Sequence, residues 1–375
     1  MKLAFCLFKY FPFGGLQRDF LRIAKECVRR GHTVNVYTMA WDGKIEPDFS
    51  ITVLSSKGWQ NHTRIKCFTA QFQQEMLDNP HDLIVGFNKM PGLDMYYAAD
   101  TCFQAKARAK HGMWYRLLPR YHHLIACERA IFAKDARTEI LSISKIQQAE
   151  FIRCYETPLS RFHLLPPGIA KERIAPANAD EIRAATRHAY HVKENQFLCV
   201  FVGSGFKTKG LDRVLLGMAF LPQDVKERTK LIVLGKDSPR IFKKQAKQLG
   251  IESQVIFLGG RDDVLKFMLA ADLLVHPAYN ENTGTVLLEA LAAGLPVLTT
   301  DVCGYAHYIT EADAGTVLPS PFQQNEFNRA LFLMLTSKKQ SHWQKNGLSF
   351  AAKADIYSMP ERAVDLIESA MRHSC

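Results

Sequence analysis

Two carboxylates, Glu281 and Glu289, stand eight residues apart in the stretch HPAYNENTGTVLLEALAAGLP (residues 276–296). The first lies in a polar loop after a short apolar run, and the second lies in an apolar run typical of a helix. Between them, Gly284 leaves the helix start uncluttered, and such a start presents backbone N–H groups without an internal partner. An anion there would be flanked by two acids, which is unfavourable unless each carboxylate binds hydroxyl groups. The pattern indicates a site for a sugar or a ribose joined to a charged group.

The helix expected after Gly284 has an apolar face made of Leu287, Leu288, Leu291 and Ala292. We expect Asn282 or Thr283 to cap its start. The residues placed to hold an anion or a sugar at this start are Asn282, Thr283, Gly284, Thr285, Val286 and Leu287. The residues alone leave an alternative open, in which Glu281 is a solvated loop residue and Glu289 is an acid that the helix dipole favours.

A pair of glycines lies near the N-terminus, in KYFPFGGLQRD (residues 9–19). Gly14 and Gly15 allow the backbone to approach a ligand closely, and the helix expected after them offers N–H groups to an anion. Asp19 falls in the first turns of that helix. A tight turn between a strand and a helix explains the same glycines equally well.

A second glycine-containing loop, VGSGFKTKGLD (residues 202–212), follows an expected buried strand. A phosphate held here would meet the amides of a helix start and the ammonium group of Lys207 or Lys209. The loop matches neither the Walker A pattern nor GxGxxG, so it predicts neither a P-loop nucleotidase nor a dinucleotide-binding oxidoreductase. Ordinary surface lysines on a solvated loop are the alternative.

Strand-like and helix-like runs alternate along the whole chain, which predicts parallel sheets covered by helices on both faces. The expected strands are Leu3–Leu7, Thr33–Met39, Asp82–Phe87, Thr138–Ile143, Phe197–Val202, Leu231–Leu234, Val255–Leu258, Leu273–His276 and Val297–Thr299. The fold class is therefore α/β, with two doubly wound, Rossmann-like domains facing each other across a cleft. A Pro-Pro-Gly sequence ending at Gly168 separates residues 1–167 from residues 168–355, and the C-terminal helix (356–375) is expected to pack back on the first domain.

The composition supports two soluble domains. The chain has 375 residues, of which 47% are hydrophobic and 23% are charged, and no apolar run approaches the ~20 residues that span a bilayer. We interpret the start, MKLAFCLFKYFPFGG, as a buried strand rather than a signal peptide, because Lys9 interrupts it and no cleavage site follows. The nine cysteines form no CxxC pair, which favours reduced thiols and a cytoplasmic location.

The formal net charge of +11 favours an anionic partner, and the basic residues are concentrated in one segment, residues 103–132. Between Thr101 and Cys127 there is no acidic residue. The cations and aromatic residues of this segment are Lys106, Arg108, Lys110, Trp114, Tyr115, Arg116, Arg120 and Tyr121. This mixture favours an anionic membrane surface. The apolar positions 114, 117, 118, 121, 124 and 125 fall on one helical stripe, although Pro119 should kink or divide it.

The segment 103–132 has two other interpretations. An ordinary domain helix would use the same apolar stripe as part of its core. His122, His123 and Cys127 offer too few ligands of known orientation to predict a metal site.

The Glu281-x7-Glu289 pair in ENTGTVLLEALAAGLPVL resembles the signature of the retaining, two-domain (GT-B) nucleotide-sugar glycosyltransferases, the family that includes sucrose-phosphate synthases and many α-mannosyltransferases. The resemblance covers the whole chain. Four further motifs narrow it to the lipopolysaccharide core glucosyltransferases: KYFPFGGLQRDF, GFNKMPGLD, LLPPGI and TTDVCGYAHYI. Members of that group transfer glucose from UDP-glucose to an inner-core heptose of lipopolysaccharide.

The resemblance implies a role for each motif of the C-terminal half. Glu289 should bind the ribose hydroxyls and Glu281 the glucose hydroxyls, while the amides of residues 284–287 hold the diphosphate or the sugar. Lys209 should neutralise the β-phosphate. The family usually has an arginine after Gly203, and this chain has Ser204 there, so Arg173 or, as a weaker candidate, Lys207 would supply the missing cation.

Three more residues take roles by the same resemblance. Gly15 should let the N-terminal loop approach the phosphate, and Arg261 is a candidate neighbour of the uracil. The family often has a histidine near the donor sugar, and the equivalent residue here is Asp100. A carboxylate cannot donate as histidine does, so Asp100 is expected to contact the glucose or the acceptor hydroxyl.

The implied reaction breaks the bond between the sugar C1 and the phosphate, with retention of configuration. Helix-start amides, Lys209 and Arg173 would stabilise the departing UDP. We expect no metal and no other cofactor, because the Asp-x-Asp signal of the other glycosyltransferase fold is absent. The expected location is the cytoplasmic face of the inner membrane. Alternatives are a transferase for another UDP-sugar, a UDP-sugar 2-epimerase, and a non-catalytic protein that binds nucleotide sugars; nucleic acid is not expected as a partner.

Overall fold

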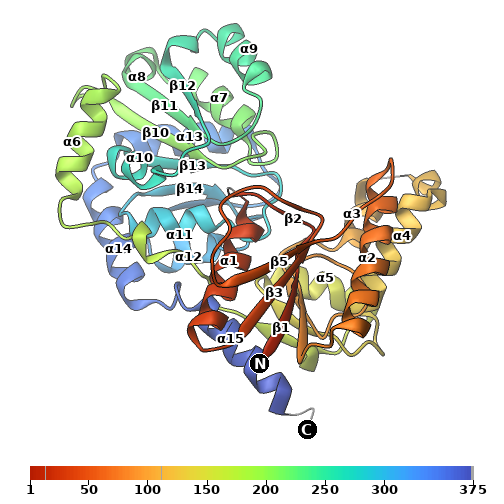
Figure 1. Ribbon diagram of the computed structural model, residues 1–375. Helices are drawn as coiled ribbons and strands as arrows, with labels where there is room; N and C mark the ends of the chain where they lie inside the picture. Colours follow the sequence, from red (N-terminus) through yellow and green to blue (C-terminus); the bar gives the residue numbers. More distant parts are fainter. Residues whose placement is uncertain (13, 111, 373–375) are drawn as a thin grey trace. The chain divides into compact units, whose positions relative to one another are not determined.

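The computed structural model describes residues 1–12, 14–110 and 112–372 (Figure 1). The chain divides into two compact units. Unit 1 contains Met1–Gly168 and the segment from Ser358 onward, and unit 2 contains Ile169–Tyr357. Each unit is built on one large parallel sheet with helices packed on it, so the predicted α/β class with two Rossmann-like sheets is confirmed.

Unit 1 is built on a seven-stranded sheet in the order β5-β3-β1-β6-β7-β8-β9. Its strands are β1 (Lys2–Cys6), β3 (Thr33–Thr38), β5 (Phe49–Val53), β6 (Leu83–Gly86), β7 (Met95–Ala98), β8 (Glu139–Ser142) and β9 (Phe162–Leu164). The short strands β2 (Lys9–Tyr10) and β4 (Ala40–Trp41) pair separately. Its helices are α1 (Gly15–Arg29), α2 (Asn61–Asp78), α3 (Phe103–Lys110), η1 (Met113–Leu117), α4 (Pro119–Phe132), α5 (Lys145–Tyr155), η2 (Leu159–Arg161) and α15 (Met359–Arg372).

The C-terminal helix α15 packs against α1 of unit 1. Arg30 donates to Asp365 (2.7 Å) and to Glu368 (3.1 Å), and His32 Nε2 lies 2.9 Å from the carboxylate of Glu368. Buried apolar residues of α15, such as Val364, join the core formed by β1 and α1. The far end of the chain therefore completes the N-terminal unit.

Unit 2 is built on a six-stranded sheet in the order β12-β11-β10-β13-β14-β15. Its strands are β10 (Phe197–Val202), β11 (Thr229–Leu234), β12 (Val255–Gly259), β13 (Leu273–His276), β14 (Val297–Thr300) and β15 (Gly315–Leu318). Its helices are η3 (Lys171–Arg173), α6 (Ala179–Ala189), α7 (Leu211–Ala219), α8 (Gln223–Arg228), α9 (Arg240–Gln248), η4 (Glu252–Gln254), α10 (Val264–Ala270), α11 (Thr285–Ala292), α12 (Ala306–Glu311), α13 (Gln324–Thr336) and α14 (Gln340–Lys353).

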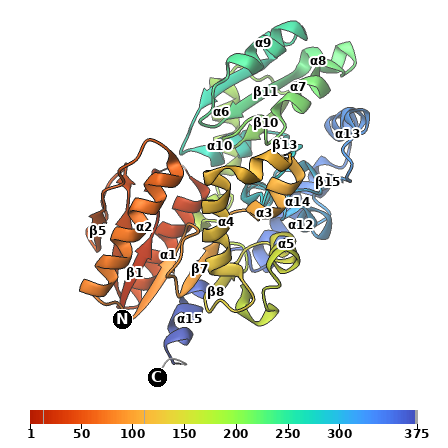
Figure 2. The ribbon, with the colours of Figure 1, turned by 90° about the vertical axis from the view of Figure 1, so that its right-hand side faces the viewer.

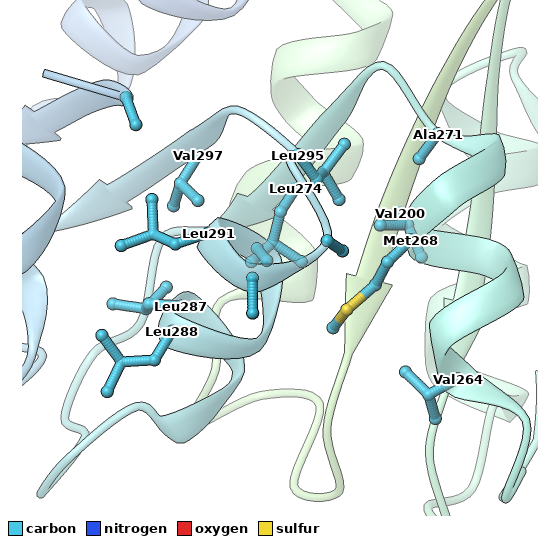
Figure 3. Packing of buried hydrophobic residues seen from close by; sticks show 14 of the residues in the cluster. Val200, Val264, Met268, Ala271, Leu274, Leu287, Leu288, Leu291, Leu295 and Val297 are labelled. Atoms are coloured by element: carbon cyan, nitrogen blue, oxygen red, sulfur yellow. The ribbon is translucent and has the colours of Figure 1, made fainter. Parts of the chain in front are cut away.

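The apolar face predicted for the helix after Gly284 is buried in the core of unit 2. Figure 3 shows Leu287, Leu288 and Leu291 of α11 in one cluster with Leu274 of β13 and Val297 of β14. Each of these five side chains is fully buried. Burial of side chains of this size contributes about 1.5–3 kcal/mol each, so α11 is held firmly on the sheet.

Within the described residues, no helix is long and apolar enough to cross a membrane. The cysteines of the described residues are free thiols, and most of them are buried.

Candidate active site

The loops after β10 and β13 meet at the point where the strand order of unit 2 reverses. These neighbouring parallel strands continue into connections on opposite sides, and ligands of open α/β sheets bind at such a point. The amide of Tyr279 donates to the carbonyl of Thr208 (2.8 Å). Gly210 has a φ of +83°, and a Cβ there would collide with the carbonyl of Pro277. Only glycine therefore lets the two loops approach this closely.

Lys209 and Glu281, which come from these two loops, form an ion pair. Their side chains are 21% and 15% exposed, so the pair is mostly screened from water. Burial lowers the pKa of Lys209. The lysine stem passes over Gly203, where a Cβ would lie 2.6 Å from Lys209 Cδ. The structure thus brings together two of the residues that the sequence singled out for the donor substrate.

His276, the last residue of β13, lies directly beside this pair. It is fully buried, its Nε2 lies 3.4 Å from a carboxylate oxygen of Glu281, and its ring stacks on Phe201. Within the described residues, neither ring nitrogen has a hydrogen-bond partner. Burial, and secondarily the charge of Lys209, lowers the pKa of His276 to about 3. The imidazole is therefore neutral at physiological pH.

From the sequence pattern, His276 is predicted only as the last residue of a strand. One signal could have found it: a polar residue at the carboxyl end of a buried strand, five positions before Glu281.

The loop that carries Glu281 is held by backbone hydrogen bonds to the segment after β14. The backbone of Glu281 pairs with Cys303 in an isolated parallel bridge, and its carbonyl accepts from the amide of Gly304 (3.3 Å). The carbonyl of Thr283 accepts from the amide of Tyr305 (2.7 Å). This explains the motif TTDVCGYAHYI, because it holds the carboxylate loop in place.

The helix start between the two acids differs in one respect from the prediction. Gly284 itself occupies the N-cap position of α11, with a φ of +82° and no side-chain cap. The expected capping by Asn282 or Thr283 is therefore wrong, because the left-handed turn at Gly284 moves the start one residue further. The amide of Leu287 donates to the carbonyl of Gly284 (2.9 Å). Thr285 and Val286 are the first helical residues, whose amides have no partner within the helix.

Glu289, one turn into α11, is paired with Arg173. The guanidinium Nε lies 3.6 Å from a carboxylate oxygen of Glu289, and both side chains are largely buried. The sequence placed Arg173 beside the phosphate, and the structure places it on the carboxylate predicted to bind the ribose. The pairing keeps the buried Glu289 from standing as an uncompensated charge.

The other cations expected near the donor have partners of their own. Lys207 is 64% exposed and binds Asp212 (2.5 Å) and the hydroxyl of Tyr279 (3.3 Å). Arg261 makes two hydrogen bonds of 2.7 Å to Asp263. Among the described residues, the structure gives neither cation a contact with the pair of Lys209 and Glu281.

The candidates from the N-terminal half lie in unit 1. Gly14 is the N-cap of α1 and Gly15 is its first residue. A carboxylate oxygen of Asp19 accepts from the hydroxyl of Tyr97 (2.8 Å). Asp100 is exposed in the loop between β7 and α3.

A residue that the sequence analysis missed, Glu128, fixes the segment beside Asp100. It is fully buried in α4 and accepts from Lys89 Nζ (2.6 Å), Tyr155 Oη (2.6 Å) and the amides of Phe103 (2.8 Å) and Gln104 (2.9 Å). It thereby supplies the acceptor that the start of α3 requires. The sequence alone gave no signal for this role, because the acceptor lies more than 20 residues along the chain from the amides it binds.

The basic segment 103–132 consists of α3, η1 and α4 rather than one helix. The division expected at Pro119 is confirmed, because Pro119 begins a new helix at α4, and the apolar positions 114–125 therefore do not form one continuous stripe. Trp114 is 83% exposed and Leu117 is 67% exposed, while Tyr115 and Tyr121 are half-buried with their rings 5.9 Å apart. Of the cations predicted for the membrane surface, Lys106, Arg108, Arg116 and Arg120 are exposed. The side chain of Lys110 lies outside the described residues.

Of the possible metal ligands His122, His123 and Cys127, two lie close together. Cys127 Sγ lies 3.7 Å from His123 Nε2. In the part of the chain that the structure describes, no group of three or more His, Cys, Asp or Glu side chains is arranged to hold a metal ion.

Comparisons with known proteins agree with this geometry. The model of the family "Glycosyl transferases group 1" matches residues 183–350. The lipopolysaccharide glucosyltransferase WaaG of Escherichia coli (strain K12) is 46% identical over 372 residues, covering 99% of this chain and 100% of that protein. A crystal structure of WaaG, described as a glycosyltransferase involved in lipopolysaccharide biosynthesis, has a TM-score of 0.93 and covers 97% of this chain and 99% of that chain. Sucrose-phosphate synthase from Thermosynechococcus elongatus shares the fold, with a TM-score of 0.79 at 16% identity over 99% of both chains.

The two parallel sheets, the family model and the match to a solved glycosyltransferase define a GT-B glycosyltransferase of group 1, and the chain is an enzyme of that class. Its full-length relationship to WaaG shows more: the chain belongs to the family of lipopolysaccharide glucosyltransferases. The fold class, the enzyme class and the family predicted from the sequence are confirmed.

Proposed function

We propose that this enzyme transfers glucose from UDP-glucose to an inner-core heptose of lipopolysaccharide, with retention of configuration. The main support is the ion pair of Lys209 and Glu281 beside the start of α11, at the switch point of unit 2. The second support is the 46% identity to a lipopolysaccharide glucosyltransferase over the full chain.

The proposed reaction uses each charged group in a separate role. Lys209 leaves Glu281 and neutralises the β-phosphate, while the amides of Thr285 and Val286 donate to the diphosphate oxygens. Glu281 then accepts hydrogen bonds from hydroxyl groups of the glucose, and Glu289 accepts hydrogen bonds from those of the ribose, with Arg173 orienting its carboxylate. The acceptor hydroxyl attacks from the face that UDP leaves, and its proton passes to a β-phosphate oxygen. Asp100 contacts the glucose or the acceptor hydroxyl.

The test is UDP release from a panel of UDP-sugars, with and without truncated lipopolysaccharide core. We expect release from UDP-glucose only when the acceptor is present. Glu281→Ala and Glu289→Ala should each lose most of this activity and keep a folded thermal transition. Preference for another UDP-sugar would show that the donor is not UDP-glucose. Conversion of the UDP-sugar without acceptor would indicate a 2-epimerase. Binding of the UDP-sugar without any release of UDP would indicate a non-catalytic protein.

The proposed reaction needs no metal ion, because a lysine and helix amides supply the positive charge that a metal provides in other glycosyltransferases. We therefore expect the initial rate in excess EDTA to equal the untreated rate within twofold. Loss of activity in EDTA that Mg²⁺ or Mn²⁺ restores would contradict this.

We also propose that the segment 103–132 binds the anionic surface of the inner membrane from the cytoplasmic side, where its glycolipid acceptor is held. The segment combines the exposed apolar side chains of Trp114 and Leu117 with four exposed cations, a mixture that suits such a surface. Each basic residue near an anionic surface contributes about 1 kcal/mol to the free energy of binding.

Replacing both Arg116 and Arg120 by glutamine should therefore weaken binding to phosphatidylglycerol vesicles by about 2 kcal/mol, or roughly 30-fold, in co-sedimentation at low salt. The matched control is Lys243→Gln/Lys244→Gln, which removes two exposed cations from α9 in unit 2. Equal losses in the two double variants would show that only the net charge matters.

A further inference from the structure

A second exposed tryptophan, Trp59, lies outside the basic segment, in the loop between β5 and α2. Its side chain is fully exposed. Arg64 of α2 donates to the carbonyl (3.3 Å) and the hydroxyl (3.2 Å) of Ser56, and Gln71 donates to the carbonyl of Ser55 (2.9 Å). The base of the loop is therefore fastened to α2, while the indole at its tip packs on nothing.

Glycine determines how the loop presents this side chain. Gly58 has a φ of +140°, a conformation that residues with a Cβ rarely adopt. A Cβ at this position would also lie 3.0 Å from Thr63 Cβ. The turn at Gly58 thus brings the chain close against the first turn of α2 and leaves Trp59 pointing into solvent.

The start of α2 lies beside the basic segment. Helix α2 contacts α4, and Figures 1 and 2 both show the two helices as neighbours in unit 1. The rings of His62 and His123 are 6.2 Å apart across this contact. Burial lowers the pKa of His123, and the charges of His62 and Lys66 lower it further, so a cation of α2 acts on a side chain of α4.

The two neighbouring elements share an unusual charge pattern. No acidic residue occurs between Phe49 and Gln74, and none occurs between Thr101 and Cys127. Lys57 and Lys66 of the first segment are exposed, as are the four cations of the second. Among the described residues, none of these six cations forms an ion pair with a carboxylate, so their charge is available to an external anion.

We propose that residues 56–66 and the segment 103–132 form one continuous surface for an anionic bilayer, with Trp59 and Trp114 as its two aromatic anchors. The inference rests on the proposed membrane binding of segment 103–132 and extends it to a separate part of the chain. Tryptophan is favoured at the level of lipid headgroups, where its ring meets acyl chains and its N–H meets water. Two anchors on different elements would fix the orientation of unit 1 on the membrane, which one anchor cannot do.

The test is co-sedimentation with vesicles of phosphatidylglycerol and phosphatidylethanolamine, with phosphatidylcholine vesicles as the uncharged reference. Trp59→Ser should weaken binding to the anionic vesicles about tenfold, and Lys57→Gln about fivefold. The matched control is Leu77→Ser, because Leu77 is 76% exposed at the other end of the same helix, next to Asp78. It should bind within twofold of the wild type. The thermal midpoint of Trp59→Ser should not change, since the side chain packs on nothing.

The outcomes separate this inference from the proposal it rests on. If Arg116→Gln/Arg120→Gln loses binding while Trp59→Ser binds as the wild type does, the surface ends at segment 103–132 and the inference is overturned. If the wild type itself does not bind anionic vesicles, membrane binding by segment 103–132 fails as well. A shift of tryptophan emission to shorter wavelength on adding vesicles, present in the wild type and reduced in Trp59→Phe, would support insertion of this indole directly.

Discussion

Replacing Lys209 by alanine is expected to lower the rate of UDP release from UDP-glucose and acceptor by two to three orders of magnitude. The departing UDP develops negative charge in a site where water is largely excluded, and the Lys209 side chain is only 21% exposed there. Removing one preorganised positive or hydrogen-bonding group from such a site costs roughly 10²–10³ in rate. Steady-state measurement of kcat and KM would show the loss mainly in kcat, because the charge develops in the transition state.

Lys207→Ala is the matched comparison for this variant. Lys207 lies two residues earlier in the same loop, yet it is exposed and bound to Asp212 and Tyr279. We expect Lys207→Ala to lose less than fivefold. A comparable loss in both variants would show that the loop needs positive charge in general, and would contradict a specific role for Lys209.

The pairing of Lys209 with Glu281 affects the free energy of binding the donor. In the free enzyme each group neutralises the other, so neither charge is buried without a partner. Binding of a nucleotide diphosphate offers Lys209 a stronger anion, and the sugar offers Glu281 hydroxyl donors. In the proposed reaction the diphosphate replaces Glu281 as the partner of Lys209, and the sugar hydroxyls replace Lys209 as the partners of Glu281. This replacement offsets most of the free energy that separating the ion pair costs.

Much of the fold follows from hydrophobic patterning. Strands buried on both faces form continuous apolar runs, and two of the expected strands, Phe197–Val202 and Leu273–His276, have the observed bounds. Four strands of the two large sheets were missed: Phe49–Val53, Met95–Ala98, Phe162–Leu164 and Gly315–Leu318. Phe162–Leu164 is three residues long, and Phe49–Val53 and Gly315–Leu318 are only partly buried, so none of these three carries a pattern that distinguishes it from a loop. Met95–Ala98 is fully buried, but four residues are too few to show a strand period.

The site was predictable as a set of residue types but not as a set of contacts. The spacing of Glu281 and Glu289 is visible in the sequence, because both lie within one strand-loop-helix unit. The contact of Glu281 with Lys209 joins residues 72 positions apart and depends on β10 and β13 being neighbours in the sheet. Glu128 was missed for the same reason, since its acceptor role depends on how α4 packs beside the start of α3.

The neutral, buried His276 should make the stability of the enzyme fall steeply below pH 6.5. Its pKa is lowered to about 3 in the folded protein, against an ordinary value of 6.5. Between these values the unfolded chain binds a proton at this ring and the folded chain does not, so acid favours unfolding. The contribution is fully present above pH 6.5 and is lost as the pH falls toward 3, at about 1.4 kcal/mol per pH unit.

Replacing His276 by leucine isolates this effect, because leucine keeps an apolar side chain on β13 and binds no proton. Urea unfolding of both proteins at pH 7.0, 6.0 and 5.0 should give free energies of unfolding that fall with acid less steeply in His276→Leu. The difference in slope should be about 1.4 kcal/mol per pH unit, the value for one proton. Of the two charges beside the ring, Glu281 would favour its protonation and Lys209 opposes it. Parallel curves for the two proteins would mean that the ring gains its proton in the folded state too, held by the carboxylate of Glu281. The histidine would then be a charged member of the pair rather than a neutral neighbour.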